Sequence, residues 1–152
     1  MKQYWLIKSE PDCYSIDDLA KEKKVSWTGV RNYQARNFIR AMKKGDSILF
    51  YHSSANPVLV AGIAEVGSDP YADTSALRKN EDHYDQKATK ENPIWSAVDV
   101  VFIKKFKNPV TLNYIKLNPK LEGMMVSQKG SRLSVQPVSE AHFKIIKAIG
   151  EK

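Results

Sequence analysis

The segment from Trp27 to Phe38 places the narrowest limits on how this chain can fold, because it leads into a helix with two chemically different faces. Apolar residues recur at the spacing of one helix face: Ala35, Phe38, Ile39 and Met42. This spacing predicts a buried stripe. Basic residues share another face, and we expect them to remain in solvent: Arg36, Arg40 and Lys43. The predicted helix therefore has the core on one side and positive charge on the other.

The residues that precede this helix are suited to holding an anion or a planar ring. The first turn of a helix has backbone N–H groups without intrahelical partners, and this end of the helix is partially positive. Arg31, Asn32 and Tyr33 lie at this point. Two interpretations stay open for Asn32, a helix cap or a ligand contact, and two for Trp27, ordinary core or the wall of a binding site.

Composition limits the class of protein. The 152 residues fit one domain with a core of its own, so we expect a single domain over residues 1–152. The formal charge of +7 favours polyanionic partners, but on its own it leaves nucleic-acid binding undecided. Cys13 has no second cysteine to pair with, and no apolar run could span a membrane. We expect a monomer in a reducing compartment, the cytoplasm or, in a eukaryote, the nucleus.

Two predicted strands end on polar or aromatic residues. The runs Met1–Lys8 and Ser47–His52 are apolar enough for strands inside a covered sheet. The side chains at their ends are Lys8, Ser9 and Glu10 in the first case, and Tyr51, His52 and Ser53 in the second. Neighbouring residues on a strand point to opposite faces, so His52 and Ser53 cannot act together as base and nucleophile.

The rest of the chain predicts more strands and three further helices. Val58–Val66 forms a hairpin with the preceding strand, and Gly62 inside it indicates a bulge. Trp95–Phe106 is the longest strand and lies inside the sheet. Gly130–Val138 predicts a last strand with polar side chains on one face: Arg132, Ser134 and Gln136. The further helices begin near Ser15, Thr111 and Ser139.

The polar stretch from Gly67 to Pro93 is long for a loop in a compact domain. We expect it to be ordered, because Tyr71 and Tyr84 give it aromatic side chains to pack, which a linker would lack.

No classical catalytic motif occurs, and His52, His83 and His142 stand too far apart in sequence to suggest metal ligands. We therefore expect no metal and no cofactor. Polar and aromatic residues instead recur at the ends of predicted elements. If these ends converge, they form a concave pocket with an aromatic wall and hydrogen-bonding groups, as a flipped-out base requires.

Four segments resemble the EVE domain family: Tyr4–Pro11, Trp27–Asn37, Phe50–Ser53 and Ser131–Val138. The resemblance runs nearly end to end. It implies an α+β, PUA-like fold, in which a curved mixed β-sheet closes toward a barrel and is flanked by helices. It also implies a reader of modified bases in DNA or RNA, which takes the base into a pocket near Trp27, Asn32 and Tyr33. The order Asp69-Pro70-Tyr71 departs from the family, where Tyr-Pro-Asp is more usual.

Two functional hypotheses follow. The first is a non-catalytic module that binds DNA or RNA carrying a modified base, such as a modified cytosine. Its predicted ligand-binding residues are Lys8, Ser9, Glu10, Trp27, Val30, Asn32, Tyr33, Tyr51, His52, Ser53, Ser134 and Gln136. Its predicted contacts to the nucleic-acid backbone are Arg31, Arg36, Arg40 and Lys43. The second hypothesis is an enzyme acting on a nucleotide or small anionic metabolite, with Glu10 as general base in a dry pocket and Lys8 or Arg36 as the anion clamp.

Overall fold

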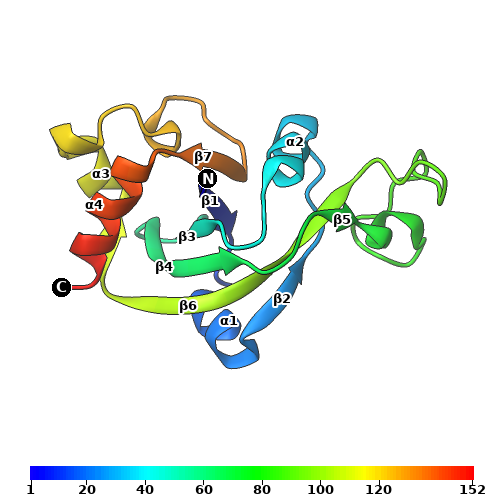
Figure 1. Ribbon diagram of the computed structural model, residues 1–152, viewed down its shortest axis with the longest axis horizontal. Helices are drawn as coiled ribbons and strands as arrows, with labels where there is room; N and C mark the ends of the chain where they lie inside the picture. The colour runs from blue at the N-terminus through cyan, green and yellow to red at the C-terminus, as the bar shows by residue number, and fades with distance from the viewer.

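Strand β1 lies between β3 and β7 in the sheet of the computed structural model, which describes residues 1–152 (Figure 1). The strands are β1 (Tyr4–Ser9), β2 (Lys24–Trp27), β3 (Ser47–His52), β4 (Leu59–Val66), β5 (Tyr71–Ala72), β6 (Ser96–Thr111) and β7 (Val135–Val138). Their order in the sheet is β2, β6, β4, β3, β1 and β7, and β5 pairs with the start of β6. Strands β1 and β3 run parallel, whereas the other pairs are antiparallel, so the sheet is mixed.

Helices cover both faces of this sheet (Figure 1). They are α1 (Ile16–Glu22), α2 (Tyr33–Ala41), α3 (Leu112–Leu117) and α4 (Glu140–Gly150), with 3-10 turns η1 (Thr74–Leu77), η2 (Pro119–Leu121) and η3 (Met125–Ser127). Trp5 and Ile7 of β1 pack in one core cluster with α1 and α2, and Leu6 packs in a second cluster with α3 and α4. Side chains of a strand alternate between faces, so both faces of β1 are apolar. The predicted α+β fold is confirmed.

A β-bulge bends β4 at Gly62. The pairing of β4 shifts register here against both of its neighbours, β3 and β6. A β-carbon at position 62 would collide with the backbone carbonyl of Lys104, so glycine permits the close approach of β4 and β6. The predicted hairpin, its bulge and the long β6 strand are thus confirmed.

Several boundaries differ from the predictions. Strand β1 begins at Tyr4 and not at Met1, and β6 continues beyond Phe106 to Thr111. Residues 24–27, for which no strand was predicted, pair with β6 as strand β2, so Trp27 ends a strand. The last strand begins at Val135 and not at Gly130. The physical reason is Gln136, which is 1% exposed and donates hydrogen bonds from Nε2 to the Leu133 carbonyl at 2.9 Å and to Ser131 Oγ at 3.2 Å. These bonds hold residues 131–134 in a turn.

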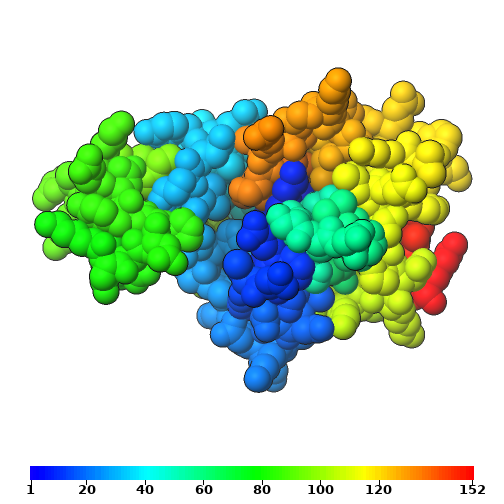
Figure 2. Space-filling model, turned by 180° about the vertical axis from the view of Figure 1, so that it is seen from behind, coloured from blue at the N-terminus to red at the C-terminus, as the bar shows by residue number.

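Residues 67–95 form a lobe that projects from one side of the molecule, drawn in green in Figure 2. The lobe contains β5 and η1, and Trp95 packs there with Ala76 and Ala88 in a small cluster of its own. The expectation of an ordered loop is confirmed, although the aromatic residue that organises it is Trp95 and not Tyr71 or Tyr84. Tyr71 lies at the surface and donates a hydrogen bond to Asp99 at 2.6 Å.

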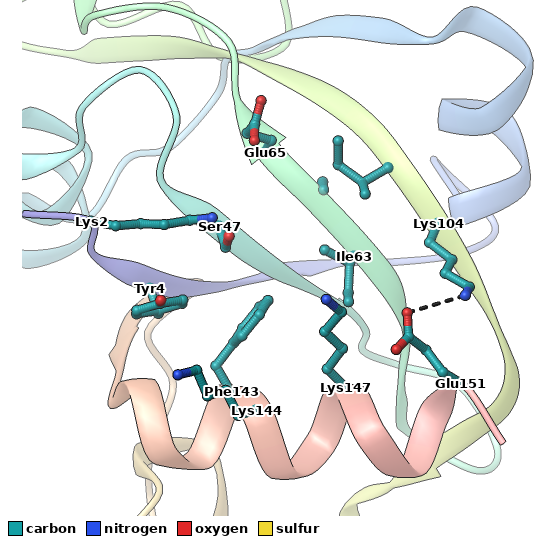
Figure 3. Close-up of a pocket in the computed structure, with 12 residues that line it drawn as sticks. Lys2, Tyr4, Ser47, Ile63, Glu65, Lys104, Phe143, Lys144, Lys147 and Glu151 are labelled. Carbon is teal, nitrogen blue, oxygen red and sulfur yellow. Dashed lines mark hydrogen bonds and ion pairs between the residues drawn. The ribbon is translucent and has the colours of Figure 1, made fainter.

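Helix α4 leaves a hollow of about 360 Å³ against β4 and β6, with lysines around an apolar floor (Figure 3). Two of these lysines are neutralised. Lys104 Nζ lies 3.1 Å from Glu151 Oε2, and Lys144 Nζ lies 3.1 Å from Glu140 Oε2. The hollow contains none of the residues predicted to bind a ligand.

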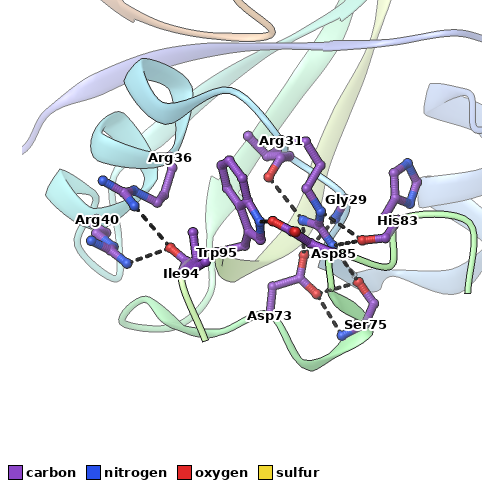
Figure 4. Close-up of polar contacts among 11 residues, drawn as sticks. Gly29, Arg31, Arg36, Arg40, Asp73, Ser75, His83, Asp85, Ile94 and Trp95 are labelled. Atoms are coloured by element: carbon purple, nitrogen blue, oxygen red, sulfur yellow. Dashed lines mark hydrogen bonds and ion pairs between the residues drawn. The ribbon is translucent and has the colours of Figure 1, made fainter. Parts of the chain in front are cut away.

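A buried ion pair joins the lobe to the residues before α2 (Figure 4). The carboxylate of Asp73 is fully buried and accepts hydrogen bonds from Arg31 Nη1 at 2.9 Å and from the Gly29 N–H at 2.8 Å. Burial alone would raise the pKa of Asp73. Hydrogen bonds from Ser75, Gly29 and Arg31 outweigh this effect and hold the pKa below its ordinary value.

We predict that Asp73→Asn lowers stability by about 3 to 5 kcal/mol at pH 7, because it leaves Arg31 without its partner. Because the pKa of Asp73 is lower in the folded protein than in the unfolded chain, the ionised carboxylate stabilises the folded state. This contribution to the free energy of unfolding is fully present above the ordinary carboxyl pKa, about 4, and disappears as the pH falls through the folded-state pKa. Denaturant unfolding of both proteins from pH 7 to about pH 2.5 should show the stability difference shrinking below about pH 4. The exposed Asp69→Asn is the control, and a difference that stays constant with pH would contradict the prediction.

Candidate functional site

The parallel pairing of β1 and β3 brings two predicted groups of residues to one edge of the sheet. Lys8 lies opposite Tyr51 and Ser9 opposite His52 in the register of these strands. The turn before β7 reaches the same edge, because the Lys8 N–H donates to the Ser134 carbonyl at 2.9 Å. Figure 2 shows these three segments side by side, in dark blue, teal and orange. The predicted convergence of these element ends is confirmed.

Trp27 lies beside this edge and is half-buried. Its ring meets Phe50 of β3 edge-on, with the ring centres 5.7 Å apart and the planes at 83°. The Tyr14 ring also packs edge-on against Trp27, at 6.1 Å. Trp27 thus contacts the main core with part of its indole and keeps part in solvent, so it is only partly a core residue, and its role as the wall of a binding site stays a prediction. Tyr14 was missed, and its position shortly after the Pro11 turn was the available signal.

Hydrogen bonds within the chain fix the turns at this edge. Ser9 Oγ donates to the Tyr14 carbonyl at 2.5 Å, and the Ser53 N–H donates to the Ser9 carbonyl at 2.9 Å. His52 Nε2 accepts the N–H of Ile16 at 3.0 Å. Burial lowers the pKa of His52, with the charge of Asp17 acting in the opposite direction. A neutral His52 that accepts at Nε2 carries its proton at Nδ1 and presents that N–H as a donor.

Glu10 does not lie in a dry pocket. Its side chain is exposed, accepts a hydrogen bond from Ser54 Oγ at 3.3 Å and contacts Cys13 Sγ at 3.6 Å. The burial that a general base in a dry pocket would require is absent. This corrects the environment that the enzyme hypothesis assumed for its general base.

Several residues predicted to bind a ligand are hydrogen-bonded within the chain or buried in its core. Asn32 caps α2, with its Oδ1 accepting the Ala35 N–H at 3.0 Å, which leaves the Nδ2 group outward. Val30 and Tyr51 are buried in the two core clusters. Burial raises the pKa of Tyr51 and lowers the pKa of Lys8, whose Nζ lies 6.0 Å from the Tyr51 ring centre.

Arg40 and Lys43 stay in solvent as expected and Arg36 is partly buried, but both arginines also bond to the lobe. Arg36 and Arg40 both donate to the carbonyl of Ile94, at 3.2 and 2.7 Å, and Arg31 is held by Asp73. Among the four residues predicted to bind the nucleic-acid backbone, Lys43 alone is exposed with a side chain that makes no hydrogen bond or ion pair. The bonds of these arginines to the lobe were not predicted, because Asp73 lies more than forty residues from Arg31 in the sequence.

Tyr33 belongs with the lobe and not with Trp27. Its ring stacks on Trp95, with the centres 4.8 Å apart and the planes at 29°, and it is 55% exposed. The predicted set therefore divides into two places, the edge beside Trp27 and the surface where α2 meets the lobe.

Known proteins are similar to this chain in sequence and fold over nearly its whole length. Thymocyte nuclear protein 1 from Homo sapiens is 36% identical over 171 aligned positions, which cover 100% of this chain and 76% of the relative. The crystal structure of human THYN1 protein in complex with DNA containing 5-methylcytosine has a TM-score of 0.92 at 35% identity, with 99% of each chain covered. A structure of a hypothetical protein from Leishmania major has a TM-score of 0.94 at 46% identity, with 99% of this chain and 96% of that chain covered.

The model of the EVE domain matches residues 3–149, nearly the whole sequence. The match includes every strand of the sheet and the edge beside Trp27. The chain therefore belongs to the EVE domain family.

Proposed function

We propose that this protein is a non-catalytic module that binds nucleic acid and takes a modified base, such as 5-methylcytosine, against Trp27. One observation carries the proposal: a half-buried indole stands beside three converging element ends, in a fold shared with a human protein in complex with DNA that contains 5-methylcytosine. A flipped base needs an aromatic face and hydrogen bonds to its edge. The exposed part of Trp27 supplies the face.

Polar groups at the end of β3 and at the start of α2 are suited to read the edge of the base. Asn32 Nδ2 and His52 Nδ1–H are donors, because the other polar atom of each side chain is already bonded within the chain. Ser53 Oγ, free of internal partners, can donate or accept. Since the surrounding turns are held by internal bonds, these groups need little ordering when the base enters.

The alternative is an enzyme in the same place. Glu10 is the carboxylate that this hypothesis needs as general base, but it is exposed and already accepts from Ser54. Binding without turnover is therefore the better supported function, and incubation with modified nucleotides, followed by chromatography of the products, tests this choice.

Affinity should depend on the modification. One extra methyl group in an apolar pocket is worth about 10-fold or more in discrimination. Oligonucleotides of one sequence, each with a single modified or plain base, should therefore differ by at least that factor in Kd for one modification, as DNA or as RNA. Fluorescence anisotropy at fixed salt measures this. Equal affinity across the whole panel would contradict the proposal.

Trp27→Ala should weaken binding of the modified oligonucleotide by at least about 1 kcal/mol, the lower end of what a base stacked on an aromatic ring contributes. Trp27→Phe should recover part of this affinity. Because Trp27 is only half-buried, the decrease in stability should stay below the roughly 3 to 5 kcal/mol typical of a fully buried aromatic residue.

The matched control is Phe38→Ala, which removes another half-buried aromatic side chain from the same core cluster. This variant should lose stability and keep its affinity. The role given to Trp27 would be wrong if both variants, compared in their folded fractions, bound the modified oligonucleotide as tightly as the unaltered protein.

A further inference from the structure

The surface where α2 meets the lobe carries two positive charges that no carboxylate neutralises. Arg36 and Arg40 converge on one acceptor, the Ile94 carbonyl, and neither guanidinium lies within 4.0 Å of an acidic side chain (Figure 4). Burial and the charge of Arg36 both lower the pKa of Arg40. Arginine remains protonated in proteins, so this pair persists as two like charges. An anion that bound both would relieve their repulsion.

The backbone is strained where it supports this pair. Ile94 has a φ of 64°, a left-handed conformation that a β-branched residue rarely adopts. This conformation presents the Ile94 carbonyl to both guanidinium groups. Strain of this kind persists where the surrounding structure fixes it, and it is common at binding sites. Arg40 Nη1 keeps its donors free, because its Nε is bonded to Ser96 Oγ at 2.9 Å and its Nη2 to Ile94.

An exposed aromatic ring completes the surface. Tyr33 is backed by the buried ring of Trp95, which is held in turn by a hydrogen bond from its Nε1 to Asp85 at 2.8 Å. The guanidinium carbon of Arg36 lies 5.0 Å from the centre of the Tyr33 ring. A rigid aromatic side chain beside unneutralised arginines matches the two parts of a nucleotide, a base that stacks and a phosphate that accepts hydrogen bonds.

This surface lies within reach of a strand whose modified base is at Trp27. Tyr33 follows Trp27 by six positions, and a chain of that length spans at most about 22 Å. The lysine-rich hollow beside α4 is less suited to a phosphate, because Glu151 and Glu140 already neutralise two of its lysines.

We propose that Tyr33, Arg36 and Arg40 form a second binding site, which takes the phosphate and the base of a nucleotide flanking the modified one. This inference rests on the proposed function. It assigns the edge beside Trp27 to the modification and the α2 surface to the neighbouring nucleotide. Arg31, paired with Asp73, is then a structural residue and binds no phosphate.

The double variant Arg36→Gln/Arg40→Gln tests phosphate binding, and glutamine keeps a donor for the Ile94 carbonyl. Affinity for a single-stranded modified oligonucleotide should fall, and the slope of log K against log salt should become less negative by about 0.7 for each phosphate that the variant no longer neutralises. The Kd for the modified nucleoside alone, measured by NMR titration, should not change. Lys116→Gln/Lys147→Gln removes two exposed charges without ion pairs, on α3 and α4, and should leave the slope nearly unchanged.

Tyr33→Leu tests stacking at this surface and keeps an apolar side chain on Trp95. It should weaken oligonucleotide binding by about 5-fold or more, and the effect should vanish when the nucleotides beside the modified base are abasic. Tyr114→Leu, at another exposed tyrosine, is the control. Thermal melting verifies that each variant is folded.

An unchanged salt slope in the folded arginine variant, or a decrease in nucleoside binding along with oligonucleotide binding, would overturn the inference. Failure of the proposed function would look different. In that case the unaltered protein would bind plain and modified oligonucleotides alike, while a shallower slope in the arginine variant would still support the phosphate site.

Discussion

The parallel pairing of β1 with β3 is the constraint on which the proposed binding edge beside Trp27 depends. Antiparallel neighbours would place their carboxyl ends at opposite edges, whereas this one parallel pair puts the Ser9 and His52 ends side by side. Strand β7, antiparallel to β1, then delivers the turn before it to the same edge. The Phe50 side chain packs against Trp27 and supports it there. One choice of strand direction thus assembles residues from four distant parts of the sequence.

Most side chains of the edge serve both the fold and the site. Asn32 and His52 each use one polar atom at a helix start, at α2 and α1 respectively, and keep the other. The fold therefore fixes the orientation of the remaining donor in advance, which reduces the entropy lost when a ligand binds. The ion pair between Arg31 and Asp73 also fixes an orientation in advance, because it joins the lobe to the residues before α2.

Local patterns in the sequence predicted the elements that depend on local interactions. The Asn32 cap, the β3–β4 hairpin and the bulge at Gly62 are of this kind. Strand β2 was not predicted, because its polar/apolar alternation extends over only four residues, Lys24–Trp27, and the strand exists through pairing with β6. The burial of the Gln136 side chain, which bonds to the Leu133 carbonyl, was not predicted. The ion pair between Arg31 and Asp73 could not be predicted either, because its partners lie far apart in the sequence. The division of the predicted site into two surfaces has the same origin: Tyr33 packs with Trp95 and not with Trp27.

The bond from the Lys8 N–H to the Ser134 carbonyl also has a consequence for the order in which the protein forms. During synthesis from the amino terminus, β1, β3, β4 and β6 are available to pair well before β7 leaves the ribosome. Pairing of β1 with β7 closes one of the longest loops in the chain and is entropically costly until the rest of the sheet exists. The sheet can therefore be nearly complete while one wall of the proposed binding edge is still missing, so this edge is completed only when β7 pairs with β1.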